Sequence, residues 1–279
     1  MKESDVKKTV REGYGKIATP GQWGAPTTNC CGTGSHAEDV SKLMGYSEEE
    51  LATLPEGANL GLGCGNPVAL ASIKEGETVL DLGSGGGIDC FLASKKVGPN
   101  GKVIGVDMTP EMLARARENA HKAGITNVEF REGEIETLPV EDNSVDCIIS
   151  NCVINLVPDK LKAFAETFRV LKPGGRLMVS DIVLTKELPG KVKESMDAYV
   201  GCVSGAVLKQ DYLKAMQDAG LTNVRVQSET SFEVSSGCCG APDDTTQIIA
   251  KNAGLTPEQV REIAPAVKSI KVTAIKPKP

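Results

Sequence analysis

The central part of the chain alternates between short apolar runs and longer segments in which apolar residues recur every three or four positions. The short runs are rich in β-branched residues and predict strands at 78–82, 102–107, 127–132, 145–150 and 176–183. Helical periodicity lies between them at 88–97, 110–124 and 159–171. Because parallel strands need crossover connections and these strands are apolar on both faces, we expect an α/β fold with a doubly wound, mostly parallel sheet.

Less regular segments stand on either side of this core. Before it, the pattern predicts an amphipathic helix at 4–17, a loop at 19–35, a short helix after Ser47 with Glu50 in its capping box, a loop at 57–67 and a helix at 67–73. After it, the pattern predicts a helix at 210–220 and strands at 223–229 and 269–275, separated by an insertion with a helix at 257–263. We expect three parts: an N-terminal helical and loop cap (1–72), a Rossmann-like domain (73–185), and a C-terminal region that completes the sheet and the substrate site (186–279).

Composition narrows the class of protein. The 279 residues are 40% apolar, which is enough for one full domain and a smaller appendage. The first residues lack the apolar segment of a signal peptide, and no run is long enough to cross a bilayer, so a cytoplasmic location is expected. The net charge of -6 and the scattered basic residues argue against nucleic acid as a partner. We expect a monomer that acts on a small molecule.

Nine cysteines are more than packing needs in a chain of this kind, and a reducing compartment argues against a disulfide framework. The adjacent pairs Cys30-Cys31 and Cys238-Cys239 do not have the spacing of zinc knuckles, and there are only two histidines. Some of the thiols are therefore expected to carry chemistry other than structural zinc binding.

A glycine-rich loop follows the first strand of the core. The run ETVLDLGSGGGID places Asp81 at the end of a strand and the loop residues directly after it, namely Gly83, Ser84, Gly85, Gly86 and Gly87. Glycines there allow close approach of the backbone to a ligand. Asp107 ends the next strand, where a carboxylate can accept hydrogen bonds from both ribose hydroxyls. Together these features predict a nucleoside site.

The charge of the loop separates two nucleoside cofactors. A dinucleotide favours G-x-G-x-x-G on a helix N-terminus, whereas here an acid stands two residues before the first glycine and suits a cationic ligand end better. The runs DLGSGGG, VDMT, GEIETLP, SNCVINL and LKPGG, in this order, resemble the class I methyltransferase superfamily. The resemblance implies S-adenosylmethionine as cofactor, with Gly83 to Gly87 facing its amino acid end, Asp107 its ribose, Met108 and Glu134-Ile135 its adenine, and Asn151 near the methyl donor.

The acceptor site has a thiol where a base is expected. Methyl transfer to oxygen or nitrogen usually needs a base, yet no His follows the fourth strand and Cys152 stands directly after Asn151. Two further glycine-flanked cysteines, Cys64 and Cys202, lie in irregular segments where packing needs no thiol. Three thiolates can converge on one soft centre. Trivalent arsenic fits, because it accepts three sulfurs and keeps a lone pair for attack on the methyl group.

The runs ANLGLGCGNP, GEIETLPVEDNSVDCIISNCVINLVPDK, FRVLKPGGRLMVSDIV and YVGCVSGA resemble the arsenite methyltransferase family over roughly residues 10 to 225. The resemblance implies that Cys152 and Cys202 hold arsenic in every round, while Cys64 joins for the first and can form a disulfide with an N-terminal cysteine. It also implies methylated and dimethylated products, and thioredoxin or glutathione as the reductant.

The remaining cysteines and histidines have less defined roles. Adjacent Cys30 and Cys31 depart from the family pattern, and we assign the resolving role to this pair without choosing between its members. The pair Cys238-Cys239 is expected to deliver metalloid or to be neutral, Cys90 and Cys147 to lie in the core, and His36 and His121 to have no functional role.

Two other functions stay open. A methyltransferase of a small organic acceptor, such as a quinone or a sterol, would share the glycine loop but has no reason to possess the three cysteines. A thiol-based metalloid sensor or buffer would need the cysteines but not the glycine loop with Asp107. Only the arsenite methyltransferase uses both sets.

Overall fold

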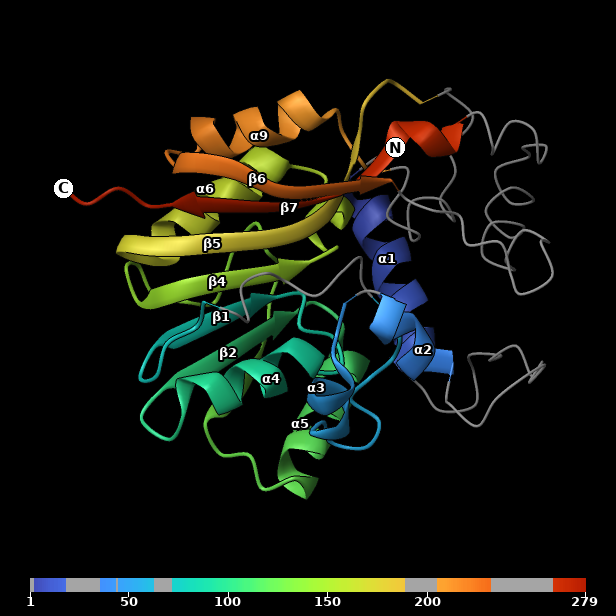
Figure 1. Ribbon diagram of the computed structural model, residues 1–279, viewed down its shortest axis with the longest axis vertical. Coiled ribbons are helices and arrows are strands. Elements are labelled where there is room, and N and C mark those ends of the chain that lie inside the picture. The colour runs from blue at the N-terminus through green and yellow to red at the C-terminus, as the bar shows by residue number, and fades with distance from the viewer. Residues whose placement is uncertain (1–2, 19–35, 44, 63–71, 189–204, 232–262) are drawn as a thin grey trace.

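The computed structural model describes residues 3–18, 36–43, 45–62, 72–188, 205–231 and 263–279. Within them a single twisted sheet has the strand order β3-β2-β1-β4-β5-β7-β6 (Figure 1). The strands are β1 (Thr78–Leu82), β2 (Lys102–Asp107), β3 (Val128–Glu132), β4 (Val145–Asn151), β5 (Leu171–Leu184), β6 (Thr222–Ser231) and β7 (Val267–Ile275). The first five strands run parallel to one another, and β7 pairs antiparallel with both β5 and β6. The predicted doubly wound, mostly parallel sheet is confirmed.

Helices cover both faces of the sheet (Figure 1). The α-helices are α1 (Glu3–Ala18), α2 (His36–Leu43), α3 (Glu48–Ala52), α4 (Ile88–Val97), α5 (Pro110–Lys122), α6 (Lys160–Val170) and α9 (Lys209–Asp218). Apolar side chains of α4 and α5 pack on one face, and those of α6 and α9 pack on the other. Short 3₁₀ helices stand at η2 (Ile154–Leu156) and η3 (Ala264–Ala266). No helix in the described ranges is both long enough and apolar enough to span a bilayer.

The N-terminal helix α1 does not form a core of its own. Its Val6 and Val10 are buried in the same cluster as Ile182 of β5 and Val267 of β7. Helix α1 thus lies over the carboxyl edge of the sheet, against elements from the far end of the sequence. The three-part division of the chain at residues 72 and 185 stays a prediction.

Most predicted elements have the expected bounds, and β5 is the main correction. It begins at Leu171, directly after α6, instead of at residue 176. Leu171 already pairs with Val145, and the register then shifts so that Arg176 pairs with Cys147. The run LKPGG is therefore an irregular start of the strand, which its glycines and proline concealed. The predicted helices at 67–73 and 257–263 lie almost entirely outside the described residues.

Candidate functional site

A cavity of about 330 Å³ opens at the carboxyl edge of the sheet. It lies where the strand order reverses between β1 and β4, which is the usual ligand position in open α/β sheets. Its volume is within the range of small-molecule sites, roughly 300 to 1,000 Å³. Of the predicted cofactor residues, the following line it: Asp81, Gly83, Ser84, Gly85, Gly86, Asp107, Met108, Glu134, Ile135 and Asn151.

The glycine loop between β1 and α4 is closely confined. At Gly83, with φ +67°, an added Cβ would lie 2.4 Å from Val153 Cγ2, whereas at Gly85, with φ +51°, it would meet nothing within 4 Å. The loop is therefore packed against protein at one end and open at the other. Gly87 does not line the cavity. It precedes α4 with φ +93°, where a Cβ would lie 2.8 Å from Phe91 Cε2, so its role is in the turn and its packing.

Asp107 ends β2 at the floor of the cavity. Its Oδ2 accepts a hydrogen bond from the Gly85 backbone N–H at 2.9 Å, and its Oδ1 accepts one from the Thr109 N–H at 2.8 Å. Burial raises the pKa of Asp107, while hydrogen bonds from Thr109, Gly85 and Met108 act in the opposite direction. Asp107 thus fixes the glycine loop as well as facing the cavity.

A second group of polar side chains lies beside the glycine loop. The Tyr46 hydroxyl donates to Asp89 Oδ1 at 2.8 Å, and the Asn151 amide donates to the Tyr46 hydroxyl at 3.1 Å and to Asp89 Oδ2 at 3.4 Å. On the next residue of α4, the Cys90 thiol donates to Asp81 Oδ2 at 3.2 Å. Asp81 and Asp89 are both buried. The network joins α4 to β4 and β1 around one side of the cavity.

The β3–β4 loop forms another wall, and α1 is tied to it. Lys7 of α1 makes ion pairs with Glu134 at 2.8 Å and with Glu136 at 2.6 Å. Lys7, Val10 and Tyr14 line the cavity together with Glu134 and Ile135. Glu134, which the sequence placed beside adenine, is therefore also the anchor of the helix that covers the site.

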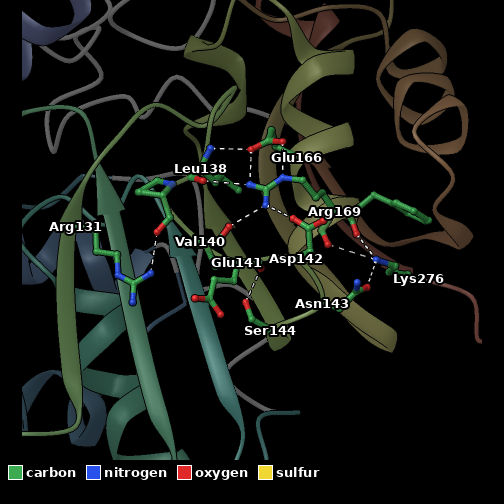
Figure 2. A network of polar contacts seen from close by, with 12 residues as sticks. Arg131, Leu138, Val140, Glu141, Asp142, Asn143, Ser144, Glu166, Arg169 and Lys276 are labelled. Carbon is green, nitrogen blue, oxygen red and sulfur yellow. Dashed lines mark hydrogen bonds and ion pairs between the residues drawn. The ribbon is translucent and has the colours of Figure 1, made fainter.

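Arg169 of α6 holds the far part of the same loop (Figure 2). Its guanidinium binds Glu166 through two hydrogen bonds of 2.7 Å and Asp142 through one of 2.6 Å. It also donates to the backbone carbonyls of Val140 and Leu138. Lys276, just beyond β7, donates to Asn143 and to the Phe168 carbonyl. Two cationic side chains, Arg169 and Lys276, thus hold the loop that carries Glu134.

Cys152 is placed at the cavity in an unusual conformation. It follows β4 with φ +59°, in the left-handed region that residues other than Gly, Asn and Asp rarely adopt. Its N–H donates to the Ser180 carbonyl at 2.8 Å, and its side chain is 6% exposed. Cys152 is disulfide-bonded, while Cys90 and Cys147, the other two cysteines of the described ranges, are free.

The other predicted thiols lie outside the described residues, namely Cys30, Cys31, Cys64, Cys202, Cys238 and Cys239. Cys90 and Cys147 are fully buried, as the sequence predicted for core cysteines. Burial raises the pKa of Cys147 to about 12 and that of Cys90 well above its ordinary value. Neither is suited to act as a thiolate.

Lys7, Tyr46 and Asp89 are among the side chains of the site that sequence reasoning missed. A signal for Tyr46 existed, because it stands directly before the Ser47 capping box, where a large apolar residue packs against the fourth helical residue, here Leu51. Nothing comparable marks Asp89 or Lys7. Their roles depend on which helix face meets the sheet.

The cavity suits a cationic nucleoside. Among the charged side chains that line it, five are carboxylates and one is a cation, Lys7, which pairs with Glu134 and Glu136. A glycine cradle, a ribose-facing carboxylate and an acidic wall fit S-adenosylmethionine better than a dinucleotide with its diphosphate.

Comparisons with known proteins agree with this geometry. Residues 73–220 match the family described as a methyltransferase domain. An arsenite methyltransferase of Halobacterium salinarum is 49% identical over 235 residues, which are 80% of this chain and 59% of that protein. The ubiquinone/menaquinone biosynthesis C-methyltransferase UbiE of Enterobacter sp. (strain 638) is 36% identical over 188 residues, 59% of this chain and 74% of that protein.

A solved structure is similar over most of its length. The arsenic (III) S-adenosylmethionine methyltransferase of Chlamydomonas reinhardtii has a TM-score of 0.61 and 30% identity, over 88% of this chain and 75% of that one. The chain spans about three fifths of the Halobacterium protein that it matches, 59% of its length.

Proposed function

This chain belongs to the arsenite methyltransferase family of class I S-adenosylmethionine-dependent methyltransferases, and we propose that it methylates thiolate-bound trivalent arsenic. The observation that carries the proposal is the position of Cys152. Its side chain lines the same cavity as the glycine loop and follows Asn151, so a thiol ligand of the acceptor lies beside the cofactor site.

The proposed reaction asks little of the protein beyond position. The cofactor supplies an activated methyl group on a sulfonium, and a lone pair on the acceptor displaces the thioether. An arsenic atom held by thiolates brings no proton to remove, so no base is needed. The backbone of the glycine loop and Asp107 hold the nucleoside, and Cys152 holds the acceptor at the cavity wall. Orientation of this kind can lower a barrier by roughly 7 to 11 kcal/mol.

The left-handed backbone of Cys152 supports a functional role. A non-glycine residue in this region costs on the order of 1 to 2 kcal/mol. Such strain is found where the surrounding structure forces a side chain into a required direction, and it clusters at active sites. At Cys152 the strand continues from Asn151, and the bond from its N–H to Ser180 holds the turn.

The rest of the acceptor site is proposed from the sequence. Cys152 and Cys202 would hold arsenic in every round and Cys64 in the first, giving methylated and dimethylated arsenicals. Thioredoxin or glutathione would return the cysteines to the reduced form, with Cys30 or Cys31 as the resolving thiol.

Calorimetry with S-adenosylmethionine alone tests the cofactor. Binding should occur without arsenite, and Asp107→Ala should weaken it at least about tenfold, because charge-assisted hydrogen bonds to ribose are lost. Asp107 also holds Gly85 and Thr109, so Asp107→Asn, which keeps one oxygen, is the companion variant. Unchanged affinity of both variants would show that the nucleoside does not bind at this end of the cavity.

Separation of arsenic species after incubation with labelled cofactor and a dithiol tests the acceptor. Cys152→Ser and Cys202→Ser should each abolish methylation of arsenite and of monomethylarsenite, because two thiolates are the minimum that can hold the methylated substrate. Cys64→Ser should lose arsenite methylation and keep the second step, in which a carbon replaces the third sulfur. Cys147→Ser is the matched control in the core. An identical response of both substrates to all three variants would refute the division of roles.

An organic acceptor is the second candidate function, favoured by the similarity to the C-methyltransferase of quinone biosynthesis. The same assay separates the two. If a quinone is methylated and arsenite is not, Cys152→Ser should leave the rate within about threefold, less than 1 kcal/mol of barrier.

A further inference from the structure

Two carboxylates beside the cavity are buried without a cation. Asp81 is 3% exposed and Asp89 is 4% exposed. Among the described residues, the groups that act most strongly on them are other acids, a tyrosine, an asparagine and a thiol, and no Lys or Arg pairs with either. A buried charge is tolerated when it is paired, and otherwise the group takes up a proton.

We propose that Asp81 carries a proton when the cavity is empty and releases it when a sulfonium enters, so that the protein distinguishes S-adenosylmethionine from its thioether product by charge. This inference rests on the proposed use of that cofactor. Asp81 thereby becomes a specificity-determining residue, and Asp89, Tyr46 and Asn151 are positioning residues that fix its surroundings.

The hydrogen bonds indicate which of the two acids is protonated. Asp89 lies in the first turn of α4, where the helix dipole favours a negative charge, and it accepts hydrogen bonds from Tyr46 and Asn151. Asp81 lies at the end of a buried strand, and its side chain accepts a hydrogen bond from the Cys90 thiol, which is a weak donor. The proton therefore belongs on Asp81.

The electrostatics agree with that assignment. Burial raises the pKa of Asp81 well above its ordinary value, and the neighbouring charge of Asp89 adds to the rise. Burial also raises the pKa of Asp89, to about 6, although the Tyr46 and Asn151 hydrogen bonds lower it. The titratable and charged groups facing the pair come from several elements: Tyr46 between α2 and α3, Glu50 of α3, Cys90 of α4, Asp107 of β2, and Lys7 of α1 with Glu134 and Glu136 across the cavity.

The cofactor and its product differ in one charge. The amino acid end is a zwitterion in both, so only the sulfonium adds a net positive charge. On binding, the O–H bond of the Asp81 carboxyl breaks, the proton goes to solvent, and the carboxylate compensates the cation. After methyl transfer the sulfur is uncharged, the carboxylate is again unpaired, and Asp81 takes up a proton from solvent. The protonated carboxyl keeps every contact that the product needs. It no longer attracts a sulfonium.

Calorimetry of the full chain in phosphate and in Tris at the same pH measures the proton exchanged on binding. S-adenosylmethionine should release a proton on binding, and S-adenosylhomocysteine close to none. Because burial raises the pKa of Asp81, the affinity for S-adenosylmethionine should rise with pH, and that for the product should not. Equal proton release with both ligands would overturn the proposal, since the shared ammonium would then be the cause.

Asp81→Asn imitates the protonated acid and gives the second test. It should abolish proton release and weaken S-adenosylmethionine about tenfold or more, while the affinity for S-adenosylhomocysteine changes less than about threefold. Retained product binding shows that the variant is folded. Asp218→Asn, which removes an exposed carboxylate of α9, should release the same proton as the unaltered chain.

The two proposals fail in different ways. If S-adenosylmethionine does not bind, the proposed function fails. If it binds without releasing a proton, or if Asp81→Asn weakens both ligands equally, only the charge discrimination fails.

Discussion

The carboxylates around Arg169 and those around the cavity are of the same chemical kind but in opposite electrostatic situations. Glu166 accepts two hydrogen bonds from Arg169, and its pKa is lowered chiefly for that reason (Figure 2). Asp81 and Asp89 have no cationic partner among the described residues, and burial raises the pKa of both. The first group finds its cation within the described residues, whereas those residues offer no cation to the second.

This difference distinguishes carboxylates that stabilise the fold from those at the candidate site. A carboxylate that finds its cation in the same chain stabilises the fold at neutral pH. A carboxylate that does not find one costs stability in the empty protein, and a binding cation recovers that cost. Removal of a charged side chain around Arg169 should therefore lower the stability of the fold. Removal of a carboxylate charge at the cavity should raise the stability of the empty protein.

The largest effect is expected at Arg169. Arg169→Ala leaves the Glu166 carboxylate and the carbonyls of Val140 and Leu138 without their donor, which should lower the free energy of unfolding by roughly 2 to 4 kcal/mol at pH 7. Urea denaturation measures it. Because the pKa of Glu166 is lowered in the folded state, the loss should shrink as pH falls below the ordinary range of a carboxyl.

Lys214→Ala is the control for Arg169, since its ion pair with Asp218 is exposed. Exposed pairs contribute up to about 1 kcal/mol, and this variant should stay within that limit. An equal loss in both variants would mean that the network around Arg169 is no stronger than a surface pair.

The opposite sign is expected in the cavity. A folded-state pKa of about 6 for Asp89, against about 3.9 unfolded, means that the folded chain loses stability as pH rises from 4 through 6. Asp89→Asn removes that cost and gives up some hydrogen bonding. Without cofactor it should be more stable than the unaltered chain by about 1 to 2 kcal/mol at pH 8, with the difference gone near pH 4.

Thermal and urea unfolding at the two pH values, without ligand, measure the effect of Asp89→Asn. Asp142→Asn, which takes a carboxylate from Arg169, should be destabilising at pH 8 and so give the matched contrast. If Asp89→Asn is the less stable chain at pH 8, the pair is compensated by a group outside the described residues.

The smallest effect concerns the backbone of Cys152. With φ +59°, glycine fits this position better than alanine, so under reducing conditions Cys152→Gly should be more stable than Cys152→Ala by about 1 kcal/mol. At Cys147, inside β4, the order should reverse, because glycine weakens a strand. If the Gly and Ala variants had the same order of stability at both positions, backbone strain at Cys152 would be contradicted.

The sequence predicted those features that depend on neighbours along the chain. The period of apolar residues gave α4 its exact bounds, Ile88–Val97, and the capping box at Ser47 is present with both of its hydrogen bonds. The glycine loop and Asp107 could be placed at the strand ends for the same reason. These signals are local, so a single pass along the chain finds them.

Contacts between distant segments could not be predicted in this way. The hydrogen bond from Tyr46 to Asp89 joins residues 43 positions apart, and Lys7 meets Glu134 across 127 positions. Periodicity says that a helix has an apolar face but not which polar residue at its rim meets another element. The left-handed turn at Cys152 has no sequence signal either, because cysteine does not favour that conformation.

The position of β7 has a consequence for how the sheet is assembled during synthesis. Strand β6 pairs only with β7 among the described strands, and β7 is the last to be made, so β6 leaves the ribosome before its neighbour exists. Until residues 267–275 have emerged, β5 also presents an open edge, which is a template for pairing with other chains. Closure of the described sheet therefore depends on β7, the last of its described strands along the chain, and in the interval before β7 emerges the edge of β5 is open to aggregation.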